Sequence, residues 1–290
     1  PDMGAYENSL ASPQHIPGTI NIPNDYATIQ AGLNAAESAD TVLVQPGTYY
    51  ENIIWPETNG IKLISAGDSS NTIIDGSANG RVIHMAPTTV LIDNATVIEG
   101  FNLKNGGNIS NGAGIHITSA SPKLIDLSIT ENITSHAIFM DYSSATLESC
   151  NVSDNSHGID ISGGASTPIL NNVTVRNNGS RGISMGGWIT PELNNVTIEG
   201  NQGGGIYILG CNPTMTNIVV INNSSWDTGG GIYIRNSDAT ISGSTISGNT
   251  SHHNGGGIWM YDSNPNISGT TITENTSEGD GGGIYMTGWS

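Results

Sequence analysis

The feature that most constrains this chain is a four-residue phrase, Gly-Ile-x-Ile or Gly-Ile-x-Met, that returns every 21 to 26 residues. Between residues 114 and 286 it occurs as GIHI, AIFM, GIDI, GISM, GIYI, GIYI, GIWM and GIYM. Self-similarity at a short fixed period is the signature of a solenoid, in which each repeat packs only on its neighbours. The chain is therefore expected to form an elongated stack of similar units.

Two further apolar segments accompany the phrase in each repeat. In one, Pro or Ala stands two residues before an aliphatic residue; in the other, Ile or Val stands three residues before an asparagine. Short segments with alternating apolar residues, separated by Gly, Asn, Asp and Ser, indicate strands and tight turns. The sequence thus predicts an all-β, right-handed parallel β-helix with three short strands per coil, rising roughly 4.8 Å per coil.

A single coil would not be stable alone. Its roughly five inward aliphatic side chains contribute about 1.5 to 3 kcal/mol each, whereas ordering a coil costs about 1 to 2 kcal/mol per residue. Neighbouring coils must therefore supply the backbone hydrogen bonds.

The asparagine column suits a turn, because Asn tolerates left-handed backbone and stacked amides can hydrogen-bond along a ladder. It also accounts for most Asn-x-Ser/Thr sequons, such as those at Asn132, Asn178 and Asn275. We expect a ladder of turn residues here, and glycosylation only where the host permits it and the amide is exposed.

The region before the clean repeats differs from them. Ile29, Leu33 and Ala36 would lie on one face of a short helix, and TVLVQ followed by Pro-Gly begins strand structure. We predict that residues 16–60 form an N-terminal cap with the first strands, covering the open edge of the first coil. Residues 61–290 are predicted to form the coils.

At this point the sequence resembles a known group. The stretch DYATIQAGLNAAESADTVLVQPGTYYENI is similar to the N-terminal cap of secreted right-handed parallel β-helix proteins of the pectate-lyase-like superfamily. The last coils, such as GGGIYIRNSDATISGSTISGNT, are similar to repeats of polymorphic outer-membrane surface proteins. The resemblance implies the fold and a secreted or cell-surface location. It does not specify the function, since the superfamily includes lyases, hydrolases, esterases, adhesins and structural proteins.

The two ends suggest a longer protein. The opening PDMGAYE resembles a phrase that often closes another β-helix domain, so residues 1–15 are predicted to be the tail of a preceding domain or a linker. The final GGGIYMTGWS begins another coil, and an unfinished coil would expose unpaired backbone groups. We therefore expect the coils to continue beyond residue 290, or copies of the protein or neighbouring β-helix domains to dock end to end.

Charge narrows the range of partners. Seven Lys and Arg against 25 Asp and Glu give a net charge of -18, which argues against nucleic acid. A polyanionic sugar would need a divalent cation as a bridge, so calcium is the one cofactor considered and none is required.

Without a run of about 18 apolar residues, direct membrane insertion of this segment is not expected. Cys150 and Cys211 fall at different repeat positions, so no disulfide is expected between them.

One cluster could carry chemistry. In GIDI, Ile159 and Ile161 should face the core, which turns Asp160 outward. Ionisable residues of the neighbouring coils should converge on it. They are Asp141, His136, His157 and Arg181.

Two carboxylates, one with a raised pKa, would suit a glycoside hydrolase, whereas a base and a cation would suit a lyase. The residue types around Asp160 permit either. The more common explanation for such a cluster is ordinary solvated side chains.

Two other sets of side chains are candidates for binding. An outward aromatic stripe is a self-packing ladder, a carbohydrate surface or a lateral contact with another rod; it consists of Tyr207, Tyr233, Trp259 and Tyr285. The lengthened turns of the last coils stack Trp226, His252 and Glu278, and are weak candidates for a metal site. The metal candidates are Asp227, His252, His253 and Asp280.

Two hypotheses for function follow. The favoured one is an extracellular structural or surface segment, such as a stalk, sheath, filament or adhesin, with polysaccharide contacts as an added role. The alternative is a polysaccharide lyase or glycoside hydrolase that acts at the Asp160 cluster. Repetition and the scarcity of cationic residues favour the first.

Overall fold

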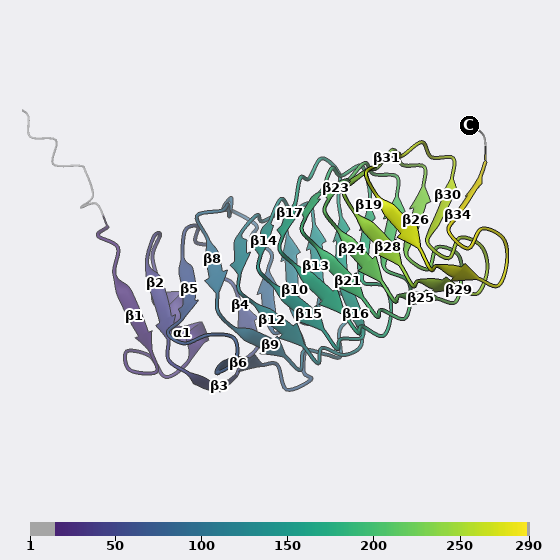
Figure 1. Cartoon of the computed structure of the whole chain (residues 1–290). Coiled ribbons are helices and arrows are strands. Elements are labelled where there is room, and N and C mark those ends of the chain that lie inside the picture. Colours follow the sequence, from purple (N-terminus) through teal and green to yellow (C-terminus); the bar gives the residue numbers. More distant parts are fainter. Residues whose placement is uncertain (1–14, 289–290) are drawn as a thin grey trace, which may run out of the picture.

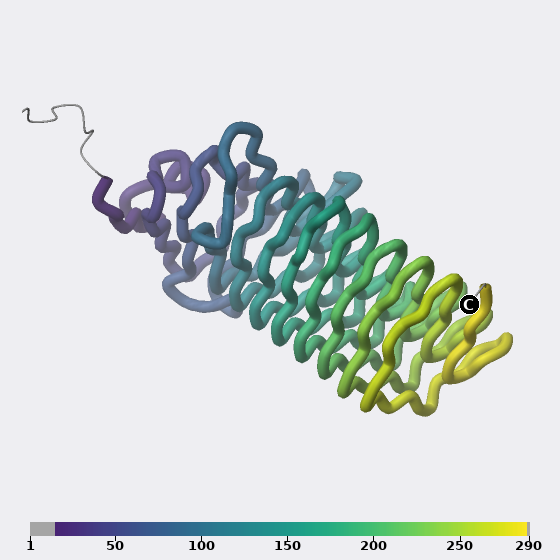
Figure 2. Tube along the Cα trace, turned by 90° about the horizontal axis from the view of Figure 1, so that it is seen from above, coloured from purple at the N-terminus to yellow at the C-terminus, as the bar shows by residue number. Residues whose placement is uncertain are grey.

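The computed structural model describes residues 15–288, which form one elongated parallel β-solenoid (Figure 1). Coils of nearly constant shape stack along the rod from its middle to its C-terminal end (Figure 2). The loops near the N-terminal end project less evenly. The predicted fold class is confirmed: three parallel sheets run the length of the rod, and the described residues contain one α-helix.

Each coil contributes one strand to each sheet, and every strand pairs in parallel with its equivalent on the next coil. Sheet A comprises β1 (Thr19–Ile22), β2 (Thr41–Val44), β5 (Lys62–Ser65), β8 (Val97–Glu99), β11 (Lys123–Ile125), β14 (Thr146–Glu148), β17 (Ile169–Asn171), β20 (Glu192–Asn194), β23 (Thr214–Thr216), β27 (Thr240–Ser242) and β31 (Asn266–Ser268).

Sheet B comprises β3 (Gly47–Tyr50), β6 (Thr72–Asp75), β9 (Asn102–Lys104), β12 (Ser128–Thr130), β15 (Asn151–Ser153), β18 (Thr174–Arg176), β21 (Thr197–Glu199), β24 (Val219–Ile221), β28 (Thr245–Ser247) and β32 (Thr271–Thr273).

Sheet C contains the recurring Gly-Ile phrase and the candidate site. Its strands are β4 (Ile53–Ile54), β7 (Ile83–Met85), β10 (Ile115–Thr118), β13 (His136–Asp141), β16 (His157–Ser162), β19 (Ile183–Gly186), β22 (Ile206–Leu209), β26 (Ile232–Arg235), β30 (Ile258–Tyr261) and β34 (Ile284–Thr287).

The lengthened turns of the last coils add a feature that the sequence did not predict. They form a small fourth sheet of β25 (Ser224–Ser225), β29 (Thr250–Ser251) and β33 (Thr276–Ser277). Three successive coils have turns of the same length here, so their backbones can pair where turns of unequal length could not.

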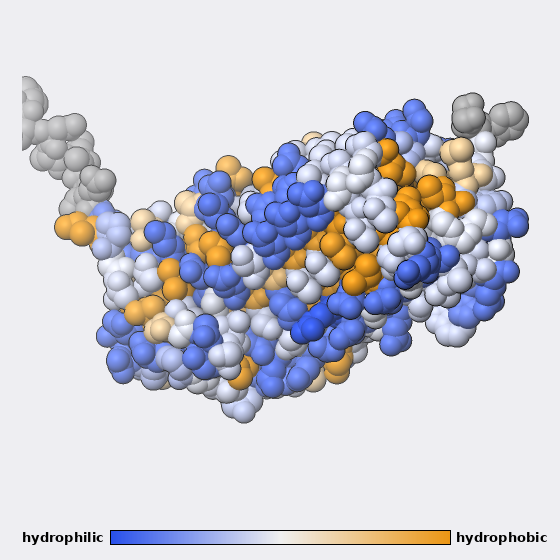
Figure 3. All heavy atoms as spheres, in the orientation of Figure 1, coloured by the Kyte–Doolittle hydropathy of each residue, from blue (hydrophilic) through white to orange (hydrophobic). Residues whose placement is uncertain are grey.

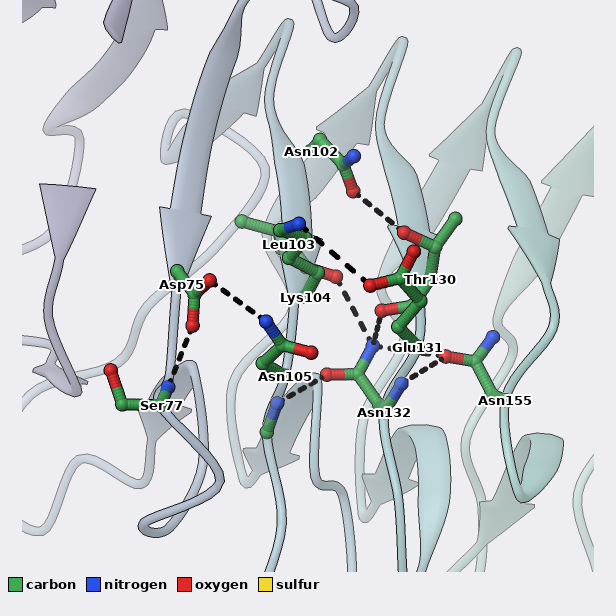
Figure 4. Close-up of polar contacts among 11 residues, drawn as sticks. Asp75, Ser77, Asn102, Leu103, Lys104, Asn105, Thr130, Glu131, Asn132 and Asn155 are labelled. Atoms are coloured by element: carbon green, nitrogen blue, oxygen red, sulfur yellow. Dashed lines mark hydrogen bonds and ion pairs between the residues drawn. The ribbon is translucent and has the colours of Figure 1, made fainter. Parts of the chain in front are cut away.

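The asparagine column is a hydrogen-bonded ladder, as predicted, and it is buried along most of its length. The expectation of left-handed backbone at these asparagines is wrong, because positive φ falls on the residues just before them, such as Glu131 (φ 56°) and Asn177 (φ 53°). From Asn132 to Asn275, each Nδ2 donates to the Oδ1 of the next asparagine at 2.9 to 3.1 Å. The same nitrogen also donates to a backbone carbonyl of the preceding coil, as Asn132 does to Leu103 at 3.1 Å. Figure 4 shows this arrangement where Asn132 meets Asn155. The sequon amides at Asn132 and Asn178 are fully buried in this ladder.

The N-terminal cap also agrees with the prediction. Helix α1 (Ile29–Ala35) begins at the N-cap residue Thr28, whose hydroxyl accepts a hydrogen bond from the Ala31 N–H at 3.1 Å. Its buried residues, Ile29 and Leu33, join the aliphatic core that fills the solenoid. The helix packs on β1, β2 and β4.

Three further expectations concern the N-terminal tail, the cysteines and the membrane. The proposed tail at residues 1–15 lies outside the described residues except for His15. Cys150 and Cys211 are both free and buried. None of the described helices is long and apolar enough to cross a bilayer. On the face drawn in Figure 3, hydrophobic side chains form a diagonal band over the C-terminal half, flanked by hydrophilic ones.

Candidate functional site

The structure brings the predicted ionisable cluster together on the outer face of sheet C. Strand alternation buries Ile159 and Ile161 and turns Asp160 outward. In register, His157 lies beside His136, and Asp160 lies beside Phe139 on one coil and Ser184 on the next. The parallel register therefore fixes which side chains meet.

His136 and Asp160 are in direct contact. Their Nε2 and Oδ2 atoms lie 3.7 Å apart, and the His136 and His157 ring centroids are 5.1 Å apart. Burial lowers the pKa of His136, and the nearby Arg181 lowers it further. Burial likewise lowers the pKa of His157, and the neighbouring His136 adds to the effect. Both imidazoles are thus mainly uncharged at neutral pH, and the contact with Asp160 is not a strong ion pair.

Asp160 has the most perturbed carboxyl of the cluster. Burial, opposed by the charge of Arg181 and aided by the charge of Asp141, raises its pKa to about 6. Asp141 lies on β13, two residues after Phe139, which pairs with Asp160. Its Oδ1 accepts a 3.3 Å hydrogen bond from the Ser162 hydroxyl. Asp160 can therefore hold a proton at mildly acidic pH, as a general acid does.

A depression of about 370 Å³ opens over this cluster, lined by all of its members except Asp141. Trp226 and Asp227 border the same space. The depression lies at Ser184, where the outward column has a small side chain between Phe139 and Tyr207. It therefore exists because the row of large side chains is interrupted.

The aromatic column lies next to this interruption and is self-packed. Tyr207 and Tyr233 stack at 4.5 Å between ring centroids, and so do Tyr233 and Trp259. Tyr285 continues the column in register with Trp259. Arg181 covers the remaining face of Tyr207, with its Cζ 3.7 Å from the ring centroid. Both faces of Tyr207 and of Tyr233 are therefore covered by neighbouring side chains.

The lengthened turns form a second stack. Trp226 and His252 stack at 4.3 Å, and His252 Nδ1 lies 2.9 Å from Glu278 Oε1. Of the other metal candidates, Asp227 borders the depression, and His253 and Asp280 take part in backbone hydrogen bonds. Over residues 15–288, no three His, Cys, Asp or Glu side chains are grouped as a metal site requires.

Sequence reasoning missed Trp188. Its side chain is 86% exposed, and its backbone has φ of 66°. It borders a second depression, of about 460 Å³, together with Leu209 and Asn212. The available signal was a tryptophan directly after two glycines, in the turn GGWITP.

The comparisons with known proteins agree with the fold. Residues 51–217 and 214–290 match the family model for the right handed beta helix region. The chain belongs to this family. The match confirms the resemblance to right-handed parallel β-helix proteins. No curated protein matches the sequence.

Several solved structures are similar to this one, among them the following three. The alginate lyase of Paenibacillus sp. str. FPU-7 aligns with a TM-score of 0.61 and 15% identity, over 90% of this chain and 99% of the lyase. The ORF18 protein of Geobacillus virus E2 aligns with a TM-score of 0.50 and 15% identity, over 93% of this chain. This chain spans 61% of that viral protein. Pectate lyase Pel9A aligns with a TM-score of 0.47 and 13% identity, over 95% of this chain and 79% of the lyase. At these identities the likeness shows the fold alone.

Proposed function

We propose that this protein is an extracellular surface β-helix that binds an uncharged polysaccharide in the depression at Ser184. The observation that carries the proposal is the interruption of the outward column, which leaves Asp160, Arg181 and two imidazoles accessible in one concave space. Sites of this kind, with a few convergent polar groups in a hollow, are typical of ligand binding.

The charge distribution favours an uncharged sugar. Arg181 is the single cation among the residues that line the depression at neutral pH, and Asp160 and Asp227 line it too. A polyanionic sugar would also be repelled by the net charge of -18 that the protein carries. Hydroxyl groups, by contrast, can both donate to the carboxylates and accept from the guanidinium.

A steric variant tests the proposal. Ser184→Tyr extends the Tyr207 stack by one ring and fills the depression, so it should fold and lose binding. Thr118→Tyr adds the same ring at an outward position of β10 and is the matched control. Affinity electrophoresis against a panel of neutral and acidic polysaccharides should retard the wild type and the control but not Ser184→Tyr. A panel that retards none of the three proteins contradicts the proposal.

A second candidate function, glycoside hydrolysis, is favoured by the raised pKa of Asp160. A general acid near pKa 6 would protonate the leaving oxygen, and Asp141 or Asp227 would act as the second carboxylate. Hydrolysis should slow as pH rises above about 6 and should be abolished in Asp160→Asn. If Asp160→Asn releases reducing ends as fast as the wild type, this function is excluded. The solved alginate lyase shows that the same fold can carry polysaccharide chemistry.

The proposal includes a structural role. A rod of stacked coils with a continuous amide ladder is rigid along its length, which suits a stalk or filament that presents the site. End-to-end contact with copies of itself or with neighbouring β-helix domains stays a prediction. Electron microscopy of the native protein near its natural concentration should show filaments or sheets; dispersed single rods would contradict this role and leave the binding proposal intact.

A further inference from the structure

The depression at Ser184 is part of a longer path. It shares Asp160, Arg181 and Ser184 with an adjoining hollow of about 150 Å³, which also borders Gly186 and Leu209. Leu209 in turn borders the depression of about 460 Å³ in the turn that follows sheet C. Because each hollow shares residues with the next, the three lie in a row.

The path follows a strand and therefore crosses the rod. Ser184 and Gly186 are the outward residues of β19, and their small side chains leave its surface low. The four residues of this strand span about 13 Å in extended conformation. On the next coil, Tyr207 and Leu209 rise beside it as a wall. A ligand on this path would lie at right angles to the aromatic column.

An exposed tryptophan lies at each end of the path. Trp226 is 75% exposed and borders the first hollow, and its stack on His252 occupies only one indole face. Trp188 is 86% exposed and borders the last hollow. These two indoles, unlike the rings of Tyr207 and Tyr233, have open faces.

The backbone holds Trp188 in this exposed position. Its φ of 66° lies in the left-handed region, which bulky residues rarely adopt. Its N–H donates to the Gly210 carbonyl at 3.0 Å, which ties the turn to the next coil. Left-handed backbone recurs in the turns that follow sheet C, as at Tyr142 with φ of 50°, so it belongs to the turn and does not by itself mark a site. What distinguishes Trp188 is that its exposed side chain borders a hollow.

We propose that the polysaccharide crosses the rod along this path, with one sugar ring on Trp188 and another on Trp226. This inference rests on the proposed function and specifies the ligand further: a chain of several neutral pyranose rings whose C–H faces are free to stack. Asn212 and Asn236, which border the hollow beside Trp188, supply amides for its hydroxyl groups.

The test compares the affinities of single variants for whichever polysaccharide retards the wild type in affinity electrophoresis. Trp188→Ala and Trp226→Ala should each weaken binding about tenfold, the equivalent of about 1.4 kcal/mol. Tyr142→Ala is the matched control, since Tyr142 is 61% exposed with φ of 50° in the corresponding turn two coils earlier. It should bind as the wild type does.

Two outcomes would overturn the path and are distinguishable from failure of the proposed function. If Trp188→Ala binds normally and Trp259→Ala does not, the chain runs along the rod axis and the proposed function stands without this path. If both tryptophan variants bind normally while Ser184→Tyr does not, the ligand is confined to the first hollow. Absence of binding by the wild type removes the proposed function itself and the path with it.

Discussion

Two stretches of sheet C differ in how their outward side chains are used. Over β22, β26 and β30, the outward rings stack face to face, so each ring covers a face of the next. These rings belong to Tyr207, Tyr233 and Trp259. Over β16 and β19, the same column holds Asp160 and Ser184, which cannot stack. The backbone is equivalent in both stretches. Where the repeat is kept, side chains stabilise the rod; where it is interrupted, they are left available to a ligand.

The largest expected effect lies in the most regular part of the molecule. Asn201→Ala removes the side chain that donates to Asn223 and Val175 and accepts from Asn178. Leaving these buried groups unpaired should cost about 4 kcal/mol of the free energy of unfolding. Denaturant unfolding measures it. The matched control Asn264→Ala, at an exposed asparagine, should change stability by less than about 0.5 kcal/mol. Equal effects would show that the ladder is not a stabilising element.

The aromatic stretch should matter for stability and not for binding. Tyr233→Ala removes two ring stacks and a half-buried ring, which should cost about 3 kcal/mol of unfolding free energy. Polysaccharide affinity should stay within about twofold of the wild type, a factor that corresponds to only a few tenths of a kcal/mol. A stable Tyr233→Ala protein with lost affinity would reverse the roles of the two stretches.

In the interrupted stretch, Asp160 should lower the stability of the protein once it ionises. The folded-state pKa of Asp160 is raised to about 6 from 3.8, so this carboxyl favours folding fully only below about pH 4, and the benefit is lost as pH rises through 6. Its side chain is 23% exposed, so ionisation should cost about 2 kcal/mol at pH 8. Asp160→Asn should therefore be about 2 kcal/mol more stable than the wild type at pH 8, with no such gain near pH 4. A gain that is the same at both values of pH would contradict the raised pKa.

The smallest expected effect comes from repairing the interruption. Ser184→Tyr continues the stack and displaces Arg181 from Tyr207, so one ring contact replaces another. The free energy of unfolding should change by less than about 1 kcal/mol. A loss of several kcal/mol would mean that the interruption is required for folding.

The period of the sequence predicted much of the site. Because a parallel β-helix pairs equivalent positions, spacing alone placed His136 beside His157 and Asp160 between Phe139 and Ser184. Spacing does not determine which way a ring faces, so the stacking of Tyr207 on Tyr233 needed the structure. It also does not determine burial, which raises the pKa of Asp160. Trp188 was missed because its turn is one of the parts that vary between coils.

The most direct test compares the two stretches in one binding titration. Arg181→Met keeps much of the side-chain length over Tyr207 but removes the charged donor from the depression. Loss of a charged hydrogen bond should weaken polysaccharide binding by about tenfold or more. We expect this loss in Arg181→Met and affinity within about twofold of the wild type in Tyr233→Ala. If Tyr233→Ala loses binding and Arg181→Met keeps it, the ligand site lies on the aromatic column and the account is wrong.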